Sequence, residues 1–191
     1  MSKPKVAVIS GFGINCELET MAAFEMAGAS ADRVHVNRLV NRESNLEDYQ
    51  IMAVPGGFSF GDHLGSGRLM GNRLRFGLRE QVTEFVKAGK LVIGICNGFQ
   101  VLVKMGLLPG DAEVSLTQTA SLALNDSGHY ENRWATLEFD PDSPCIWTRG
   151  ISRMRVPVRH GEGQVRDRRP HPTRSVGRNR STGSPLCQSI H

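Results

Sequence analysis

The sequence has few cysteines and no long apolar run. Its four cysteines lie far apart and none forms a Cys-x-x-Cys pair, which argues against a zinc site or a disulfide framework and for a reducing compartment. No segment approaches the ~18 consecutive apolar residues that a membrane-spanning helix needs. The first five residues lead directly into an apolar segment, so we expect no signal peptide. These features predict a cytoplasmic protein with no membrane partner and no metal site.

Most of the chain also lacks an excess of positive charge. The formal net charge is +4, but residues 164–191 hold six arginines and one acidic residue, so residues 1–163 sum to −1. A nucleic-acid-binding surface should be spread over a folded face, and we therefore expect no nucleic-acid partner. Binding of RNA or DNA through the arginine-rich segment is an alternative that predicts a steep salt dependence, abolished by deleting residues 164–191.

The chain is long enough for one domain with a substantial core, and its composition is that of an ordinary globular protein: 191 residues, 39% hydrophobic and 22% charged. Short apolar segments alternate with amphipathic ones. The segments predicted as strands are 6–10, 34–40, 51–54 and 91–95. One helix is predicted to follow an N-cap at Asn15, and a second helix is predicted over residues 73–88. This alternation predicts an α/β fold with a mostly parallel open sheet and helices on both faces.

Beyond Gly110 the pattern changes. The segments Trp134–Phe139, Cys145–Thr148 and Met154–Val158 predict short antiparallel strands added to the sheet. From Gln164 the apolar periodicity ends, and arginine, serine, proline and glycine dominate. We therefore divide the chain into a globular domain over 1–163 and an atypical tail over 164–191, for which we expect disorder or a shift of the reading frame.

The segment Leu91–Gln100 has the pattern of a nucleophile elbow. A buried strand predicted over 91–95 leads into Cys96, and a helix is predicted to begin at Asn97. Gly94 and Gly98, two residues before and after the cysteine, allow the strand and helix backbones to approach. A thiol at a helix N-terminus lies near unpaired N–H groups that favour the thiolate. The pattern favours Cys96 as a nucleophile over the alternative of a buried core cysteine.

Two further loops are candidates for the same site. Gly56 and Gly57 follow a buried strand and offer N–H groups unhindered by side chains, as an oxyanion site requires, although a plain Pro-Gly turn is the alternative. His160 and Glu162 lie two residues apart in a glycine-rich loop after a strand. They suit a ligand or partner contact, and an exposed turn explains the same spacing equally well.

Four motifs together carry a family resemblance. They are Pro55-Gly-Gly-Phe-Ser-Phe-Gly-Asp62, Gly94-Ile-Cys-Asn-Gly-Phe-Gln100, Gly106-Leu-Leu-Pro-Gly110 and Val158-Arg-His-Gly-Glu-Gly163. Over residues 5 to 163 the chain resembles the glutaminase subunits of phosphoribosylformylglycinamidine synthases, which are class I (triad) glutamine amidotransferases with a flavodoxin-like fold.

The resemblance implies an enzyme of purine biosynthesis that hydrolyses glutamine and passes ammonia to an ATP-dependent synthetase. Cys96 would be the nucleophile that forms a γ-glutamyl thioester, Gly57 and Asn97 would supply oxyanion N–H groups, and Gln100 would help to hold glutamine. It implies no cofactor in this subunit, with ATP and magnesium in the synthetase. The implied partners are that synthetase and a small accessory subunit.

The family completes its triad with a histidine and a glutamate in a Pro-His-Pro-Glu segment. Pro170-His171-Pro172-Thr173 resembles that segment, but threonine stands where the family has glutamate and the segment follows His160 too closely. We do not assign triad roles to His160 or Glu162. General acid–base help is worth about 10²–10⁴-fold in rate, so we expect little or no turnover from this chain. A non-catalytic docking subunit and a cysteine-elbow peptidase, chaperone or deglycase remain alternatives.

Overall fold

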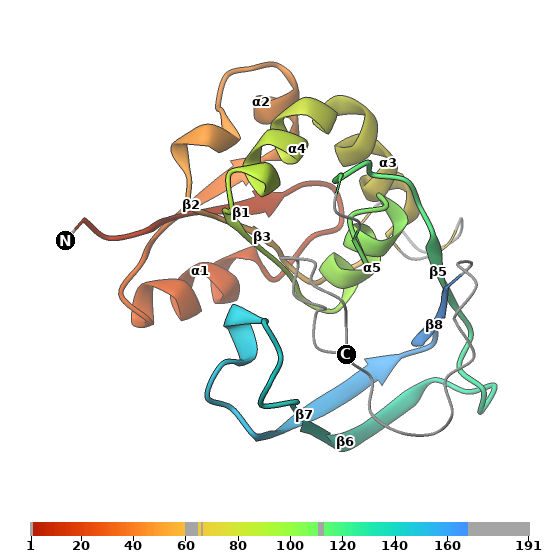
Figure 1. Ribbon diagram of the computed structural model, residues 1–191. Helices are drawn as coiled ribbons and strands as arrows, with labels where there is room; N and C mark the ends of the chain where they lie inside the picture. The colour runs from red at the N-terminus through yellow and green to blue at the C-terminus, as the bar shows by residue number, and fades with distance from the viewer. Residues whose placement is uncertain (1, 60–64, 66, 111–112, 168–191) are drawn as a thin grey trace.

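A four-stranded parallel sheet forms the centre of the molecule (Figure 1). The computed structural model describes residues 2–59, 65, 67–110 and 113–167. The strand order is β2-β1-β3-β4, from strands β1 (Lys5–Ser10), β2 (Ser30–His35), β3 (Ile51–Val54) and β4 (Leu91–Gly94). The predicted α/β fold with a mostly parallel sheet is confirmed. All four strands point the same way, so the loops that leave their carboxyl ends gather at one edge.

The two faces of the sheet are covered unequally. Alternation along β1 sends Ala7 and Ile9 into a large core and Val6 and Val8 into a smaller one. The large core is closed by four helices: α2 (Val36–Val40), α3 (Arg68–Gly77), α4 (Arg79–Lys87) and α5 (Asn97–Lys104). The smaller core is closed by α1 (Glu17–Met26) and by the 3₁₀ turn η2 (Ile146–Thr148), as Figure 1 shows.

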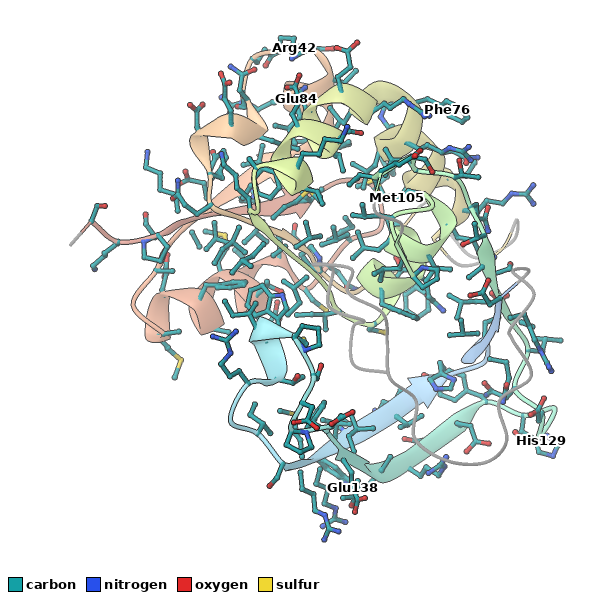
Figure 2. All side chains as sticks on the ribbon, in the orientation of Figure 1. Arg42, Phe76, Glu84, Met105, His129 and Glu138 are labelled. Carbon is teal, nitrogen blue, oxygen red and sulfur yellow. The ribbon has the colours of Figure 1, made fainter. Side chains whose placement is uncertain are left out.

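Side chains fill the space between these helices and the sheet (Figure 2). Met105, just after α5, is completely buried, whereas Phe76 on α3 is exposed and points outward. On the opposite face, Trp147 of η2 contacts the ring of Phe24 edge-on, with centroids 6.3 Å apart. Its indole N–H donates to the carbonyl of Val92 at 3.1 Å. The indole therefore anchors η2 to β4. Among the described strands, β4 pairs only with β3 and forms an edge of the sheet. Leu91 and Ile93 are for that reason partly buried, whereas the sequence predicted a fully buried strand.

Three predictions about the first half of the chain are wrong in detail. The strand predicted over 34–40 ends at His35, because Val36 and Leu39 have helical spacing and are buried in helix α2. The helix predicted over 73–88 is two helices, since the backbone of Leu78 leaves the helical region at φ −125° and ψ 17°. Asn15 is not the N-cap of α1; Cys16 occupies that position and makes no side-chain cap bond.

The second half of the chain forms antiparallel strands, but these do not join the central sheet. Strand β6 (Glu131–Glu138) pairs with β7 (Arg153–His160), and β5 (Ala120–Ala123) pairs with β8 (Gln164–Asp167), as two separate two-stranded sheets. Residues 145–148, predicted as a strand, contain the turn η2 instead. The expectation that regular structure ends at 163 is wrong for 164–167, which form β8. The remaining tail, 168–191, lies outside the described residues.

Two general expectations can be compared with the described part of the chain. No helix there is both long enough and apolar enough to cross a membrane. Cys16 and Cys96 are free thiols, and Cys187 lies outside the described residues.

Candidate active site

Cys96 lies at a sharp corner between β4 and α5. Its backbone has φ 53° and ψ −113°, a positive φ that residues other than glycine rarely adopt. A Cβ on Gly94 would lie 2.8 Å from the backbone of Gly98, and a Cβ on Gly98 would overlap the carbonyl of Val54. The two glycines therefore allow the contact that holds the corner in place, and the Cys96 side chain is exposed rather than buried in the core.

The loop after β3 packs directly against this cysteine. The Cα of Gly56 faces Cys96 so closely that a Cβ there would lie 3.5 Å from the Cβ of Cys96. Two backbone hydrogen bonds fix the loop from its other side. The N–H of Phe58 donates to Gly13 at 2.7 Å, and the N–H of Asn15 donates to Gly56 at 3.4 Å. The loops after β1, β3 and β4 thus meet around the sulfur, as parallel strand ends predict.

Gly57 is forced into its position by the loop after β1. Its φ is 141°, and a Cβ on it would overlap the carbonyl of Gly13 and lie 2.9 Å from the N atom of Asn15. Only glycine fits such a backbone and such a space. Its N–H makes no hydrogen bond in the described part of the chain, whereas the N–H groups of Phe58 and Ser59 are both bonded.

The N–H of Asn97 is the second unpaired donor beside the sulfur. It belongs to the first residue of α5, where N–H groups have no partner within the helix, and no described acceptor receives it. Backbone N–H groups without a partner, placed beside a thiol, can stabilise the negative oxygen that forms when sulfur adds to a carbonyl. In the described part of the chain, the loop after β3 and the start of α5 each offer one such candidate donor next to Cys96.

A chain of side-chain hydrogen bonds joins three segments of the site. The Asn97 Oδ1 atom accepts from the N–H of Ser59 at 3.1 Å and from its hydroxyl at 2.7 Å. The Asn97 Nδ2 atom donates to the Gln100 Oε1 atom at 3.0 Å. The Gln100 Nε2 atom in turn donates to the carbonyl of Glu162 at 3.4 Å. The structure thus brings Gly57, Asn97 and Gln100 together with the 161–163 loop.

His160 is held by a residue that the sequence did not single out. Its Nδ1 atom lies 2.9 Å from the Oδ1 atom of Asn125, and the Nδ2 atom of Asn125 donates to the His160 carbonyl at 2.8 Å. Asn125 also accepts from the N–H of Gly163 at 3.0 Å. Asn125 therefore shapes the loop that carries Glu162. Among the described residues, no hydrogen bond joins Cys96 to a histidine, and His171 lies outside them.

Cys16 is a second thiol at the same loop. A Cβ on Gly56 would lie 3.8 Å from its sulfur, so Cys16 and Cys96 flank the same glycine. Burial raises the pKa of the Cys16 thiol above its usual range, and the negative charges of Glu19, Cys96 and Glu17 raise it further. Cys16 is therefore poorly suited to act as a thiolate at neutral pH.

Comparison with known proteins decides the family. Residues 3–182 match the family described as the CobB/CobQ-like glutamine amidotransferase domain. The chain belongs to this family. It is 47% identical over 86% of its length to the phosphoribosylformylglycinamidine synthase subunit PurQ of Dehalococcoides mccartyi, and 45% identical over 84% to PurQ of Methanococcus maripaludis. The resemblance drawn from the four motifs is confirmed.

The chain spans 64% and 59% of the lengths of those two relatives. A solved structure described as PurLQS from Thermotoga maritima matches this chain over 87% of its length and over 70% of the solved chain, with a TM-score of 0.68 and 29% identity. A glutamine amidotransferase from the same organism, at 19% identity and a TM-score of 0.54, supports the fold alone.

Sequence reasoning missed three residues of this site: Ser59, Cys16 and Asn125. In the sequence, Ser59 looks like any polar loop residue. Its role becomes visible only in the structure, where its hydroxyl makes a buried hydrogen bond to Asn97. Asn125 lies 35 residues from His160 and nothing in its neighbours indicates the contact. The signal available for Cys16 was its position in the loop after the first strand.

Proposed function

We propose that this chain is the glutamine-hydrolysing component of a phosphoribosylformylglycinamidine synthase, in which Cys96 is the nucleophile. The observation that carries the proposal is an exposed cysteine at a strained strand-to-helix corner, packed against the Gly56–Gly57 loop, with the N–H groups of Gly57 and Asn97 lacking an acceptor among the described residues. Family membership supports glutamine as the substrate. The match to relatives named as synthase subunits supports purine biosynthesis as the context.

The proposed reaction has two steps. The Cys96 sulfur adds to the γ-carboxamide carbon of glutamine, and the negative charge that forms on the carboxamide oxygen faces the N–H groups of Gly57 and Asn97. The carbon–nitrogen bond then breaks, and the nitrogen leaves as ammonia after taking up the proton that the Cys96 thiol has lost. Water hydrolyses the resulting γ-glutamyl thioester to glutamate and restores the thiol.

Gln100 and the 161–163 loop form the proposed wall of the glutamine site. The Gln100 Oε1 atom accepts from Asn97 and one Nε2 N–H donates to Glu162, which leaves the second N–H of the amide to donate to the substrate. The contact between Gln100 and the carbonyl of Glu162 supports a role for the loop with His160 and Glu162 in binding glutamine or the partner.

No residue is assigned as the general base. His160 is bonded to Asn125, and among the described residues Cys96 has no histidine partner. We regard the match of Pro170-His171-Pro172-Thr173 to the family's triad segment as accidental, and those residues lie outside the described part of the chain. We therefore predict that glutamate release stays low even with the synthetase present. Turnover matching that of a relative with the intact Pro-His-Pro-Glu segment would contradict this prediction.

The proposed partner is an ATP-dependent synthetase that consumes the ammonia, with ATP and magnesium bound in that subunit and none in this one. The structural match to an assembly described as PurLQS supports a synthetase partner, and we include a small accessory subunit in the proposal. Co-purification with the synthetase in the absence of ammonia production would instead favour the docking-subunit alternative.

Protection of the thiol tests glutamine recognition without requiring turnover. We expect glutamine, but not asparagine, to slow the alkylation of Cys96 by iodoacetamide, because the shorter side chain cannot place its carboxamide at both Gly57 and Asn97. Peptide mass mapping would follow Cys96 and use Cys16 in the same chain as the internal control. Equal protection by the two amides, or activity on glyoxals or peptides without glutamine, would overturn the proposal in favour of another cysteine-elbow hydrolase.

A further inference from the structure

The side chain of Asn97 is buried at the contact between two loops of the site. Asn97 is 2% exposed and Ser59 is completely buried. The N–H of Ser59 can only donate, so the atom of Asn97 that faces it must be the carbonyl oxygen. This fixes the orientation of the amide, and its NH₂ group then faces the Gln100 oxygen, as the structure shows. Each polar atom of the Asn97 amide therefore has a partner.

The contacts of Ser59 with Asn97 hold the end of the short loop that contains Gly57. Among the described residues, the loop from 56 to 59 is hydrogen-bonded to Gly13 and Asn15 on one side and to the Asn97 oxygen on the other. Gly57 lies between these two anchors, and its N–H has no acceptor in the part of the chain that the structure describes. Loss of the Asn97 anchor would leave the Ser59 N–H buried and unsatisfied, a state that loops relieve by moving.

We propose that the Asn97 side chain is a positioning residue, which holds residues 56–59 against the elbow and so keeps the Gly57 N–H beside the Cys96 sulfur. The proposal rests on the proposed function, since it assigns the side chain a role in the same oxyanion site. Asn97 thus contributes twice: its backbone N–H is one donor to the oxyanion, and its side chain fixes the location of the other donor.

The test compares two reactions of the same sulfur in the full chain. With 4-nitrophenyl acetate, the Cys96 thiolate adds to the ester carbonyl, a carbon–sulfur bond forms, and 4-nitrophenolate leaves with its electron pair. This step passes through an oxyanion. Alkylation by iodoacetamide displaces iodide from carbon and forms no oxyanion. The ratio of the two rates, after subtraction of the Cys96→Ala background, reports oxyanion stabilisation separately from the amount of thiolate.

Three variants separate positioning from general stability. Asn97→Ala removes both Ser59 bonds and should lower the ratio by about tenfold or more, the cost of a misplaced catalytic group. Ser59→Ala keeps the backbone bond to Asn97 and should lower it less. Gln81→Ala is the matched control. Gln81 is a buried amide on α4 that accepts from the N–H of Leu46 and donates to the carbonyl of Leu39, away from Cys96.

Each outcome is decisive. A wild-type ratio no higher than that of N-acetylcysteine would overturn the proposed function, and the positioning role with it. A high wild-type ratio that both Asn97→Ala and Ser59→Ala retain would overturn the positioning role alone, as would an equal loss in Gln81→Ala. If Asn97→Ala does not fold, Ser59→Ala carries the test, with amide hydrogen exchange at Phe58 expected to rise.

Discussion

The carbonyl oxygen of Val54, at the end of β3, lies against the Cα of Gly98 in the first turn of α5, with no room for a methyl group between them. This contact ties the helix that follows Cys96 to a neighbouring strand of the sheet. It explains why the corner at Cys96 can hold a strained backbone, because the strand before it and the helix after it are each fixed by the core.

Replacement of Gly98 by alanine should therefore destabilise the fold. Because the added Cβ would overlap backbone rather than a flexible side chain, we expect a loss of about 3 kcal/mol or more in the free energy of unfolding. Gly161→Ala is the control, since its nearest neighbour would be the Tyr130 ring at 4.0 Å. Urea unfolding would measure both, and similar midpoints for the two variants would show that the contact with Val54 is not rigid.

The adjacent glycines of the loop after β3, Gly56 and Gly57, should respond differently to alanine. A Cβ on Gly57 would overlap the Gly13 carbonyl at a φ that disfavours alanine, whereas a Cβ on Gly56 would make ordinary contacts at 3.5 Å. We expect Gly57→Ala to be less stable than Gly56→Ala by about 1–3 kcal/mol. Thermal unfolding of the two variants side by side tests this order, and the reverse order would refute the geometry of the loop.

The two tryptophans provide a matched test of the smaller core. Trp147→Phe removes the hydrogen bond to Val92 and part of the contact with Phe24, so we expect it to cost about 1–3 kcal/mol of stability. Trp134→Phe should cost well under 1 kcal/mol, because Trp134 is 61% exposed and its ring contacts only the Arg155 guanidinium among charged groups that the structure describes. Chemical denaturation of both variants measures the difference, and equal costs would contradict the packing described for η2.

Cys16 should be alkylated with an unusual dependence on pH. Burial and the neighbouring Glu19, Cys96 and Glu17 side chains raise its pKa above the ordinary cysteine value of 9.0, so its thiolate forms at a higher pH than that of an ordinary cysteine. We expect slow modification by iodoacetamide at neutral pH, with a midpoint of the rate above that value. Glu19→Gln removes one negative charge and should move the midpoint downward. Peptide mapping across pH measures both, and an unshifted midpoint would rule out this electrostatic environment.

The sequence was most informative where structure is decided locally. The spacing of Gly94, Cys96 and Gly98 predicted the corner, because a strand that turns into a helix through one residue requires glycines at those positions. It failed at Val36–Val40, where a short apolar run suits either a strand or a buried helix and tertiary packing decides. The prediction failed again at β8. Residues 164–167 show no strand pattern of their own, and they form a strand because they pair with residues 120–123.

The interior of the site was beyond sequence reasoning for a related reason. The contact between Ser59 and Asn97 joins residues 38 positions apart through a single amide oxygen, and neither residue type indicates a partner. The same holds for Asn125 and His160, which are 35 positions apart. Motifs identify the groups that touch a substrate, whereas the groups that hold them in place emerge only from the fold.

The most direct test of the account is labelling by 6-diazo-5-oxo-L-norleucine, a glutamine analogue with an electrophilic carbon next to the carbonyl. The diazo carbon would take up a proton equivalent to the one that the Cys96 thiol releases, and the sulfur would then displace dinitrogen and form a stable carbon–sulfur bond, with no later turnover step that needs a general base. We predict one equivalent of label on Cys96, none on Cys16, none in Cys96→Ala, and protection by glutamine. An unlabelled Cys96 that iodoacetamide still alkylates, or a label that glutamine does not block, would contradict the assignment of Cys96 as the glutamine nucleophile.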